Sequence, residues 1–317
     1  MPMPMTPNPT TPTRPLSFGI KTSQMGIGYE EILAIWRDAD RIPLFEHAWL
    51  WDHMVPLRGD VRGAALEAWT LLAALAAQTT RLRLGVMVTD NRLRLPTLLA
   101  KMAATVDIIS GGRLIFGVGV GGSLTRTLDP AVLAIVRREF DAYGVELVPT
   151  PEAIAALGEA LTITRRLWTE TEPFDFEGRW YRLHGAIGEP KPVQRQGPPV
   201  LIGAGGERLS LRVVAEHADI WNCPATAPED FARLSRALDQ HCAAVGRDPA
   251  EIVRSAQFIA SRDDAAGARE RILSFIAEGA THLVVAARPA PTPGPPVAPA
   301  AEWLATQIVE PVIAQTA

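Results

Sequence analysis

The residues best suited to proton transfer lie in the tripeptide Trp51-Asp52-His53, which follows a short apolar segment. Histidine is the side chain that most readily exchanges a proton near neutral pH. An adjacent carboxylate can fix the tautomer of the imidazole and maintain its basicity. We therefore interpret His53 as a catalytic group and Asp52 as the residue that orients it. The structural alternative is that Asp52 caps the next segment and His53 only packs.

A run of small residues forms a second candidate site. The run Gly203-Ala204-Gly205-Gly206 is followed by Glu207-Arg208, where a helix is expected to begin. Backbone amides at a helix N-terminus bind phosphate, and the guanidinium of Arg208 can add a charge-assisted contact. A tight turn is the alternative, but four near-consecutive small residues exceed what a turn needs. The pattern therefore favours an anion site that holds the phosphate of a cofactor.

Two further segments could contact the ring of such a cofactor. Thr89 and Asn91, in the segment VTDN, can hydrogen-bond the polar edge of a heterocycle, although the segment also suits an ordinary polar turn. Gly119 and Gly121 belong to a G-x-G-x-x-G string. A dinucleotide-binding site requires a helix directly after that string, whereas Asp129-Pro130 and an irregular stretch follow here. Glycines at this place instead allow a flat ring or a bulky substrate to approach the backbone.

The elements that must position these residues alternate between short β-rich runs and longer helical runs. Strands are predicted at 17–21, 47–51, 82–88, 113–118, 199–204, 219–222, 252–260 and 282–287. Helices are predicted at 29–40, 66–78, 96–109, 151–168, 207–218, 228–245, 265–278 and 300–313. A long irregular stretch is expected at 119–151, a small hairpin at 174–183, and a Pro-rich loop at 288–299.

Eight strand–helix units favour an α/β fold of the TIM (β/α)8 barrel type, with insertions at its C-terminal face. In this fold the catalytic groups lie just beyond the C-terminal ends of the strands. The four candidate segments follow the second, third, fourth and fifth predicted strands, so we expect them at one rim. Residues 16–317 are predicted to form a single catalytic domain. Residues 1–15, rich in Pro and Thr, are predicted to be a disordered tail.

Composition limits the classes of partner. The chain has 317 residues, 47% of them apolar, and a net charge of −4, so no basic field draws it to nucleic acid or anionic membranes. It has no apolar run long enough to span a bilayer. Two cysteines without framework spacing fit a reducing cytoplasm, and no histidine has a partner at metal-ligand spacing. We expect a cytoplasmic protein without a metal, acting on a small organic molecule.

Taken together, several segments resemble the luciferase-like monooxygenase superfamily, and within it the F420-dependent oxidoreductases. The carriers of the resemblance are FGIKTSQ, FEHAWLWDH, TRLRLGVMVTDNRLRLPTLLAKMAATVDIISGGRLIFGVGVG, EPKPVQ and PPVLIGAGGERLSLRVVAEHADIWN. The resemblance implies a TIM barrel that binds F420 or FMN, with the ring in the barrel mouth and the phosphate near the strand-five glycines. It places Asp52-His53 near the reactive part of the cofactor and Thr89 and Asn91 beside the ring. It also implies a cis peptide near Met87-Val88, behind the ring, and a homodimer.

The chain departs from the family pattern at two places. Gly122-Ser123 replaces a Trp-Asn pair or a glutamate, so a carboxylic acid is missing there, and Leu95 replaces a histidine before Pro96. We expect hydride transfer between F420 and an organic substrate. The alternatives are an FMN-dependent monooxygenase, or a barrel subunit that binds a flavin or deazaflavin without turnover. The polyanionic tail of F420 needs basic residues on the rim, for which Arg92, Arg94 and Arg208 are the candidates.

Overall fold

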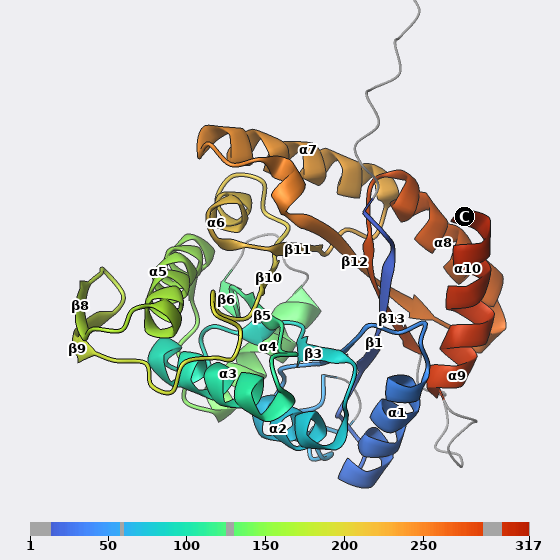
Figure 1. The fold of residues 1–317 in the computed structure, drawn as a ribbon, viewed down its shortest axis with the longest axis horizontal. Helices are drawn as coiled ribbons and strands as arrows, with labels where there is room; N and C mark the ends of the chain where they lie inside the picture. Colours follow the sequence, from blue (N-terminus) through green and yellow to red (C-terminus); the bar gives the residue numbers. More distant parts are fainter. Residues whose placement is uncertain (1–13, 58–59, 125–129, 288–299, 317) are drawn as a thin grey trace, which may run out of the picture.

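The computed structural model describes residues 14–57, 60–124, 130–287 and 300–316. Within these residues the strands form one parallel sheet that curls into a barrel, and the helices lie around its outside (Figure 1). The expected tail at 1–15 falls outside the described residues apart from its last two positions, and the loop expected at 288–299 also falls outside them. No described helix has the length and apolarity needed to cross a membrane.

Nine strands make up the sheet, in the order β3-β2-β1-β13-β12-β11-β10-β5-β4. They are β1 Ser17–Thr22, β2 His47–Leu50, β3 Arg83–Val86, β4 Thr89–Asp90, β5 Phe116–Gly119, β10 Val200–Gly203, β11 Ile220–Cys223, β12 Val253–Ala260 and β13 His282–Ala287. Strands β3 and β4 together are the third strand predicted from the sequence. The eight predicted strands are therefore confirmed.

The barrel closes through the segment that contains β3 and β4. Strand β3 pairs with β2, whereas β4, three residues further along, pairs with β5 on the opposite edge of the sheet. A parallel bridge between Leu84 and Leu114 adds to this closure. The peptide bond between Met87 and Val88, which lie between the two strands, is cis, as the family resemblance predicted. The TIM barrel is thus confirmed.

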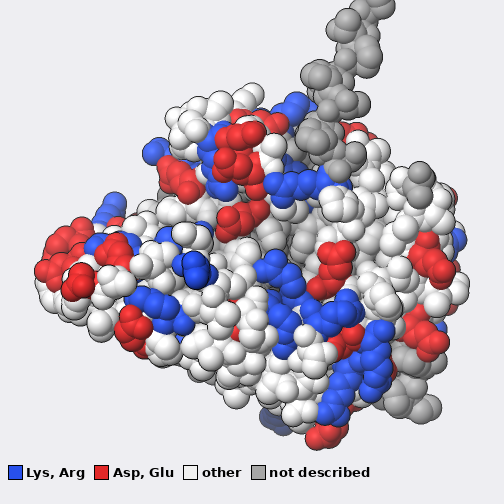
Figure 2. All heavy atoms as spheres, in the orientation of Figure 1, with Lys and Arg blue, Asp and Glu red and all other residues white. Residues whose placement is uncertain are grey.

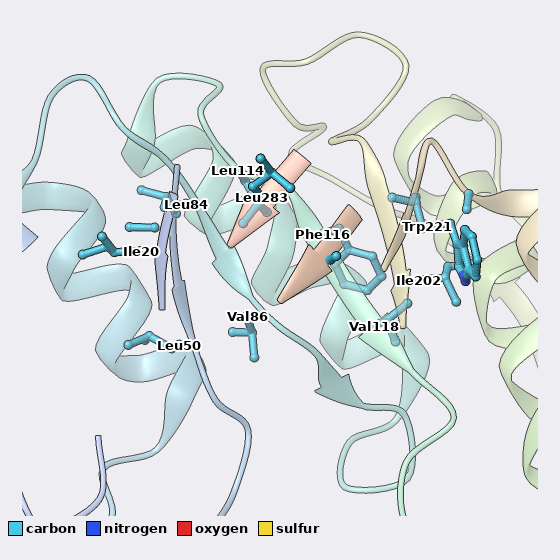
Figure 3. Close-up of a cluster of buried hydrophobic side chains, with 14 of the residues drawn as sticks. Ile20, Leu50, Leu84, Val86, Leu114, Phe116, Val118, Ile202, Trp221 and Leu283 are labelled. Atoms are coloured by element: carbon cyan, nitrogen blue, oxygen red, sulfur yellow. The ribbon is translucent and has the colours of Figure 1, made fainter. Parts of the chain in front are cut away.

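Helices cover the outer face of the barrel. They are α1 Tyr29–Arg41, α2 Ala68–Gln78, α3 Pro96–Ser110, α5 Thr150–Thr169, α6 Ser210–His217, α7 Pro228–Ala244 and α8 Ala265–Ala277. The last helical stretch comprises α9 Ala300–Leu304, a π-helical turn Ala305–Val309 and α10 Glu310–Thr316. Outward strand side chains such as Ile20, Leu84 and Phe116 point to the layer between strands and helices (Figure 3). Burial of these apolar side chains is the main stabilising term of such a layer.

The prediction of an irregular stretch at 119–151 is wrong. This segment contains strand β6 Ser123–Leu124, helix α4 Pro130–Ala142 and strand β7 Val148–Pro149, with β6 paired to β7. The sequence carries the signal of this helix, because Pro130 suits a first helical position and a run of good helix formers follows. The sequence analysis did not predict this helix because the glycine-rich segment Gly119–Gly122 precedes it.

A second correction concerns the helix after strand five. It begins at Ser210 rather than at Glu207, and a turn over residues 207–209 separates it from the glycine run. The small hairpin is confirmed, with β8 Phe174–Glu177 antiparallel to β9 Arg182–Ala186. The hairpin projects at the end of α5 (Figure 1), and Figure 2 shows acidic side chains gathered at this projecting edge.

The interior of the barrel has an apolar layer above a buried histidine pair. The apolar layer consists of Trp49, Met87, Ile115, Leu201, Ile220 and Val284. Below it the rings of His47 and His282 stack with centroids 3.9 Å apart. Gly19 makes room for this pair, because a Cβ there would lie 1.7 Å from Nδ1 of His47. The close stack therefore depends on glycine at that position of β1.

Each histidine of the pair has a hydrogen-bond partner at Nδ1. The indole N–H of Trp49 donates to His47 over 2.7 Å, and the hydroxyl of Ser255 lies 2.8 Å from Nδ1 of His282. Burial lowers the pKa of His282 to about 3 and the pKa of His47 well below its ordinary value. Both imidazoles are consequently neutral at pH 7, and His47, which accepts at Nδ1, carries its hydrogen on Nε2.

We expect the free energy of unfolding to fall as the pH drops below about 6.5, where the histidines of the unfolded chain begin to bind protons. The folded pKa of each buried histidine is depressed, so its stabilising contribution is present above the unfolded pKa and is lost as the pH falls. The loss is up to about 1.4 kcal/mol per pH unit for each histidine. His282→Gln, whose amide can still hydrogen-bond Ser255, should remove the contribution of one histidine to this pH dependence. Urea unfolding between about pH 7.5 and about pH 5.5 measures it.

The matched control for this measurement is His184→Gln, since His184 lies on the hairpin with its side chain 76% exposed. That variant should keep the wild-type slope. Equal slopes for wild type and His282→Gln would contradict a neutral buried pair.

Candidate active site

His53 lies at the barrel mouth, but the residue that orients it is not the predicted one. Its Nδ1 is 3.0 Å from Oε2 of Glu139, and the other oxygen of Glu139 accepts the backbone N–H of Met54. The prediction that Asp52 orients His53 is therefore wrong. The His53 side chain is 29% exposed, and its Nε2 makes no hydrogen bond within the described residues. This nitrogen is the atom left free for a ligand.

Glu139 is a functional candidate that the sequence reading missed. It belongs to α4, and this region contacts the loop after β2 at further points. Arg138 of α4 donates to the carbonyl of Pro56, and the hydroxyl of Tyr143, directly after α4, donates to that of Met54. The helix thus holds the loop that carries His53. Glu139 is 86 residues away in the chain, so only recognition of α4 as a helix over the mouth could have suggested the pair.

Asp52 has a different set of partners. Arg94 makes two hydrogen bonds to it, of 2.7 and 2.9 Å, and also pairs with Glu67. The backbone N–H of Asp90 donates to the same carboxylate over 2.8 Å. Asp52 and Arg94 are almost completely buried, and such pairs hold their geometry because neither charge tolerates losing its partner. Asp52 therefore anchors the loops after β2 and β4, and Arg94 is not free to bind a cofactor tail.

Glycines at the mouth make room for the residue after the cis bond. A Cβ on Gly119 would lie 2.7 Å from a methyl carbon of Val88, and one on Gly203 would lie 3.0 Å from the other. Val88 occupies the space that these two glycines leave, so they serve packing rather than direct approach of a ring to the backbone. Val88, beside Met87 of the barrel core, forms the apolar wall at this side of the mouth.

The loops after β4 and β5 are tied together by Asp90. Its carboxylate accepts the backbone N–H groups of Arg92 and Gly122, at 2.7 and 2.9 Å. Burial raises the pKa of Asp90 to about 6, against the lowering effect of these two hydrogen bonds. Gly121 has φ of 83°, and a Cβ there would lie 2.0 Å from an Asp90 oxygen. Gly121 is thus required by backbone conformation and by the close carboxylate.

Thr89 and Asn91 lie on either side of Asp90, and both are buried. The hydroxyl of Thr89 accepts the indole N–H of Trp69, a residue of α2, over 3.2 Å. The Thr89 side chain therefore faces the helix layer rather than the mouth. A contact between a cofactor ring and Thr89 or Asn91 stays a prediction.

The strand-five loop presents unpaired donors. The backbone N–H groups of Gly205, Glu207 and Arg208 have no hydrogen-bond partner within the described residues, and all three residues are exposed. The N–H of Gly206 is already taken by the hydroxyl of Ser210, over 2.9 Å. Ala204 is buried, and its N–H is bonded to the carbonyl of Asn222. A phosphate would therefore meet Gly205 and the turn after it, with the free guanidinium of Arg208 alongside.

The other half of the mouth contains a cavity of about 450 Å³. Lys21, at the end of β1, lines it together with Trp51 and Gln257, and Cys223 also reaches it. Burial raises the pKa of the Cys223 thiol to about 11, so this cysteine stays a neutral wall residue. The sequence reading missed Lys21, although a lysine in an otherwise apolar first strand was a signal of the same kind as His53.

Comparison with known proteins gives one family for the chain. The model of the luciferase-like monooxygenase family matches residues 13–309. An F420-dependent glucose-6-phosphate dehydrogenase of Kineococcus radiotolerans is 30% identical over 254 residues, covering 79% of this chain and 69% of that protein. A phthiodiolone/phenolphthiodiolone dimycocerosates ketoreductase of Mycobacterium bovis is 33% identical over 217 residues, covering 66% of this chain. The chain spans only about half, 52%, of the length of that ketoreductase.

A solved structure supports the fold independently. An F420-dependent secondary alcohol dehydrogenase, in complex with an F420-acetone adduct, superposes with a TM-score of 0.74 over 86% of this chain and 94% of that one, at 17% identity. At that identity the likeness concerns the fold alone.

We expect Arg94→Met to lower the free energy of unfolding by about 3–5 kcal/mol, because it leaves the carboxylate of Asp52 buried without its charge partner. Urea unfolding followed by circular dichroism measures this change. Arg41→Met is the matched control, since its pair with Asp38 is solvent-exposed and should contribute little. A loss for Arg94→Met no larger than for Arg41→Met would contradict the anchoring role of the Asp52–Arg94 pair.

Proposed function

The chain belongs to the luciferase-like monooxygenase family, and on that premise we propose that it is an F420-dependent oxidoreductase that acts on a small organic carbonyl or alcohol. The observation that carries the proposal is the set of unpaired donors on the strand-five loop. Free N–H groups at Gly205, Glu207 and Arg208, with the free Arg208 guanidinium, match the acceptor oxygens of a cofactor phosphate. F420-dependent relatives in the same family support the choice of cofactor.

The residues of the mouth suit a ring placed between Val88 and His53. Val88 offers an apolar wall, and the loops around Asp90 are held rigidly by its hydrogen bonds. When bound, the deazaflavin ring of F420 would give a hydride to a carbonyl in its reduced form, or take one from an alcohol in its oxidised form. The protein binds the cofactor at the strand-five loop and excludes water from the wall side of the ring. In this proposal Met87, Val88, Asn91 and the Gly205–Arg208 loop are the cofactor-binding residues.

His53 is the residue that holds or moves the proton in this proposal. Its Nδ1 faces the buried carboxylate of Glu139, so Nε2 is the atom that meets the substrate oxygen. A carboxylate at Nδ1 fixes the tautomer and the orientation of the imidazole, as general acid–base catalysis requires. Glu139 thus has the orienting role toward His53 that the sequence predicts for Asp52.

The helix α4 also accounts for the family glutamate that is missing after Gly121. A Cβ on Gly122 would lie 2.4 Å from the ring of Phe140, so α4 occupies the space over this glycine. The neighbouring Glu139 is the carboxylate that reaches the mouth. An acid on α4 therefore takes the place of an acid in the loop after β5.

The cofactor is tested by fluorescence titration of the protein with F420 and with FMN. F420 should bind, and Arg208→Glu should weaken its binding about tenfold or more, or ~1.4 kcal/mol, because a repulsive charge replaces an attractive one at the phosphate. Arg182→Glu, an exposed substitution on the hairpin, is the control and should leave the affinity unchanged. Saturation by FMN without binding of F420 would favour the flavin monooxygenase instead.

The role of His53 is tested on turnover, with F420H2 and whichever compound of a ketone and aldehyde panel is reduced. His53→Ala should lower kcat by ~100-fold or more with little change in F420 affinity. Glu139→Gln should lower kcat less, and its effect should largely vanish in the His53→Ala background, since both substitutions act on one unit. Normal turnover of His53→Ala would assign the proton to water or to another side chain.

A further inference from the structure

The barrel mouth is divided into two halves by the strand order. The residues assigned above to the cofactor and the proton follow strands β2, β3, β4 and β10, which lie in one half of the barrel once the sheet closes beside β5. The cavity of about 450 Å³ instead lies at the ends of β1, β11, β12 and β13, which form the opposite contiguous half. Trp51 borders both, because its ring lies 6.1 Å from that of His53 and also lines the cavity.

Lys21 is the charged group of this second half that faces inward. The residue is only 9% exposed, and its Nζ lies 3.9 Å from the centroid of the Trp51 ring. The ammonium donates one hydrogen bond, of 2.7 Å, to Oε1 of Gln257. No carboxylate within the described residues pairs with it, so two of its three N–H donors are left without an oxygen acceptor.

A directed chain of hydrogen bonds keeps the Gln257 oxygen turned toward Lys21. The amide nitrogen of Gln257 donates to Asn222 over 2.6 Å, and the amide nitrogen of Asn222 donates to the hydroxyl of Ser255 over 3.0 Å. The hydroxyl of Ser255 is also hydrogen-bonded to Nδ1 of His282. Gln257 and Asn222 each turn the amide nitrogen toward the next residue of the chain, so the Gln257 oxygen, at the end nearest the mouth, is left as the acceptor. The interior of the barrel is thereby arranged to hold a lysine donor in place.

Among the described residues, the cavity walls contain basic and neutral groups but no acid. The titratable side chains that line it with Lys21 are Cys223, which burial keeps neutral, and Arg271, whose partner Asp264 is not among the lining residues. The other lining residues are mostly apolar: Pro224, Ala225, Phe258, Ile259, Phe275, Val284 and Ala286. A cationic end in an apolar cavity complements a ligand that has an acidic end and an apolar body.

We propose that Lys21 anchors an acidic group of the substrate, so that this protein acts on organic molecules that carry a carboxylate on an apolar body. The inference deepens the proposed function and rests on it only in taking the occupant of this cavity to be the substrate. Lys21 holds the carboxylate in the β1–β13 half, and the body of the substrate extends past Trp51 toward His53.

The pKa of Lys21 determines in which direction binding of an acid should change with pH. Burial lowers the pKa of Lys21 to about 7, and a bound carboxylate raises it again by favouring the ammonium. Linkage then requires the acid to bind best below that pKa and more weakly as the pH rises through it, by up to about tenfold per pH unit. A neutral analogue of the acid shows no such dependence.

The test uses the carbon signals of lysine, because Lys21, Lys101 and Lys191 are the three lysines of the chain. The protein is labelled with 13C at lysine Cε, with and without F420, and titrated with hexanoate and with its neutral match hexanamide. The Lys21 signal is assigned as the one missing in Lys21→Met and as the one that titrates near neutral pH. Hexanoate should shift this signal and raise its titration midpoint, while the signals of the other two lysines stay in place.

Two comparisons decide the outcome. Lys21→Met should bind hexanoate at least about tenfold more weakly, whereas Lys101→Met, on the surface of α3, should bind it like wild type. An unmoved Lys21 signal at high hexanoate, or an equal shift with hexanamide, would overturn the proposal. Since these arms need no cofactor, failure of F420 to bind leaves their result intact, and F420 binding without a hexanoate effect overturns this inference alone.

Discussion

Closure of the barrel through residues 83–90 constrains everything else at the mouth. The segment pairs with β2 at its beginning and with β5 at its end, so it belongs to both edges of the sheet. Between the two pairings Met87 enters the barrel core and Val88 fills the space over Gly119 and Gly203. Larger residues at those glycines would push Val88 out of place, because buried atoms cannot overlap. The shape of the mouth therefore follows from how this one segment turns.

Buried charges then set the positions of the loops on the rim. Asp52 is neutralised by Arg94, and Glu139 is shared by His53 and a backbone amide. Asp90 accepts one backbone N–H from its own loop after β4 and one from the loop after β5. An unpaired buried charge costs several kcal/mol, so each of these pairings restricts its loop to one arrangement. His53 is held in one orientation because Glu139 joins α4 to the loop after β2.

Lys21 is the exception to this pairing of buried charges on the rim. It is as buried as the paired residues, yet its protein partners are the neutral Gln257 and the face of Trp51. The two halves of the mouth differ in this respect: Asp52, Arg94 and Glu139 have partners within the protein, whereas Lys21 has no acidic partner among the described residues. The substrate proposed for this site rests on that contrast.

The sequence by itself determined the barrel and the rim. The alternation of strands and helices is a local pattern, and so are the polar or glycine-rich segments after four strands. Such patterns can be recognised in the sequence without knowing the tertiary contacts. Arg208 and His53 could be picked out in this way, because each follows directly on a strand that the periodicity predicts. The helix α4 was also present in the sequence, but the glycines before it suggested an irregular stretch.

Only the tertiary structure decided which residues are partners. Asp52 adjoins His53 in the chain but turns to Arg94, while Glu139 reaches His53 from 86 positions away. Successive residues after a strand point in different directions, so adjacency in the chain does not imply contact in space. Lys21 could likewise be interpreted only once β12 had placed Gln257 beside it, with no acid among the described residues that line the cavity. Residue type and strand position are written in the chain, whereas the pairing of charges depends on the closed barrel.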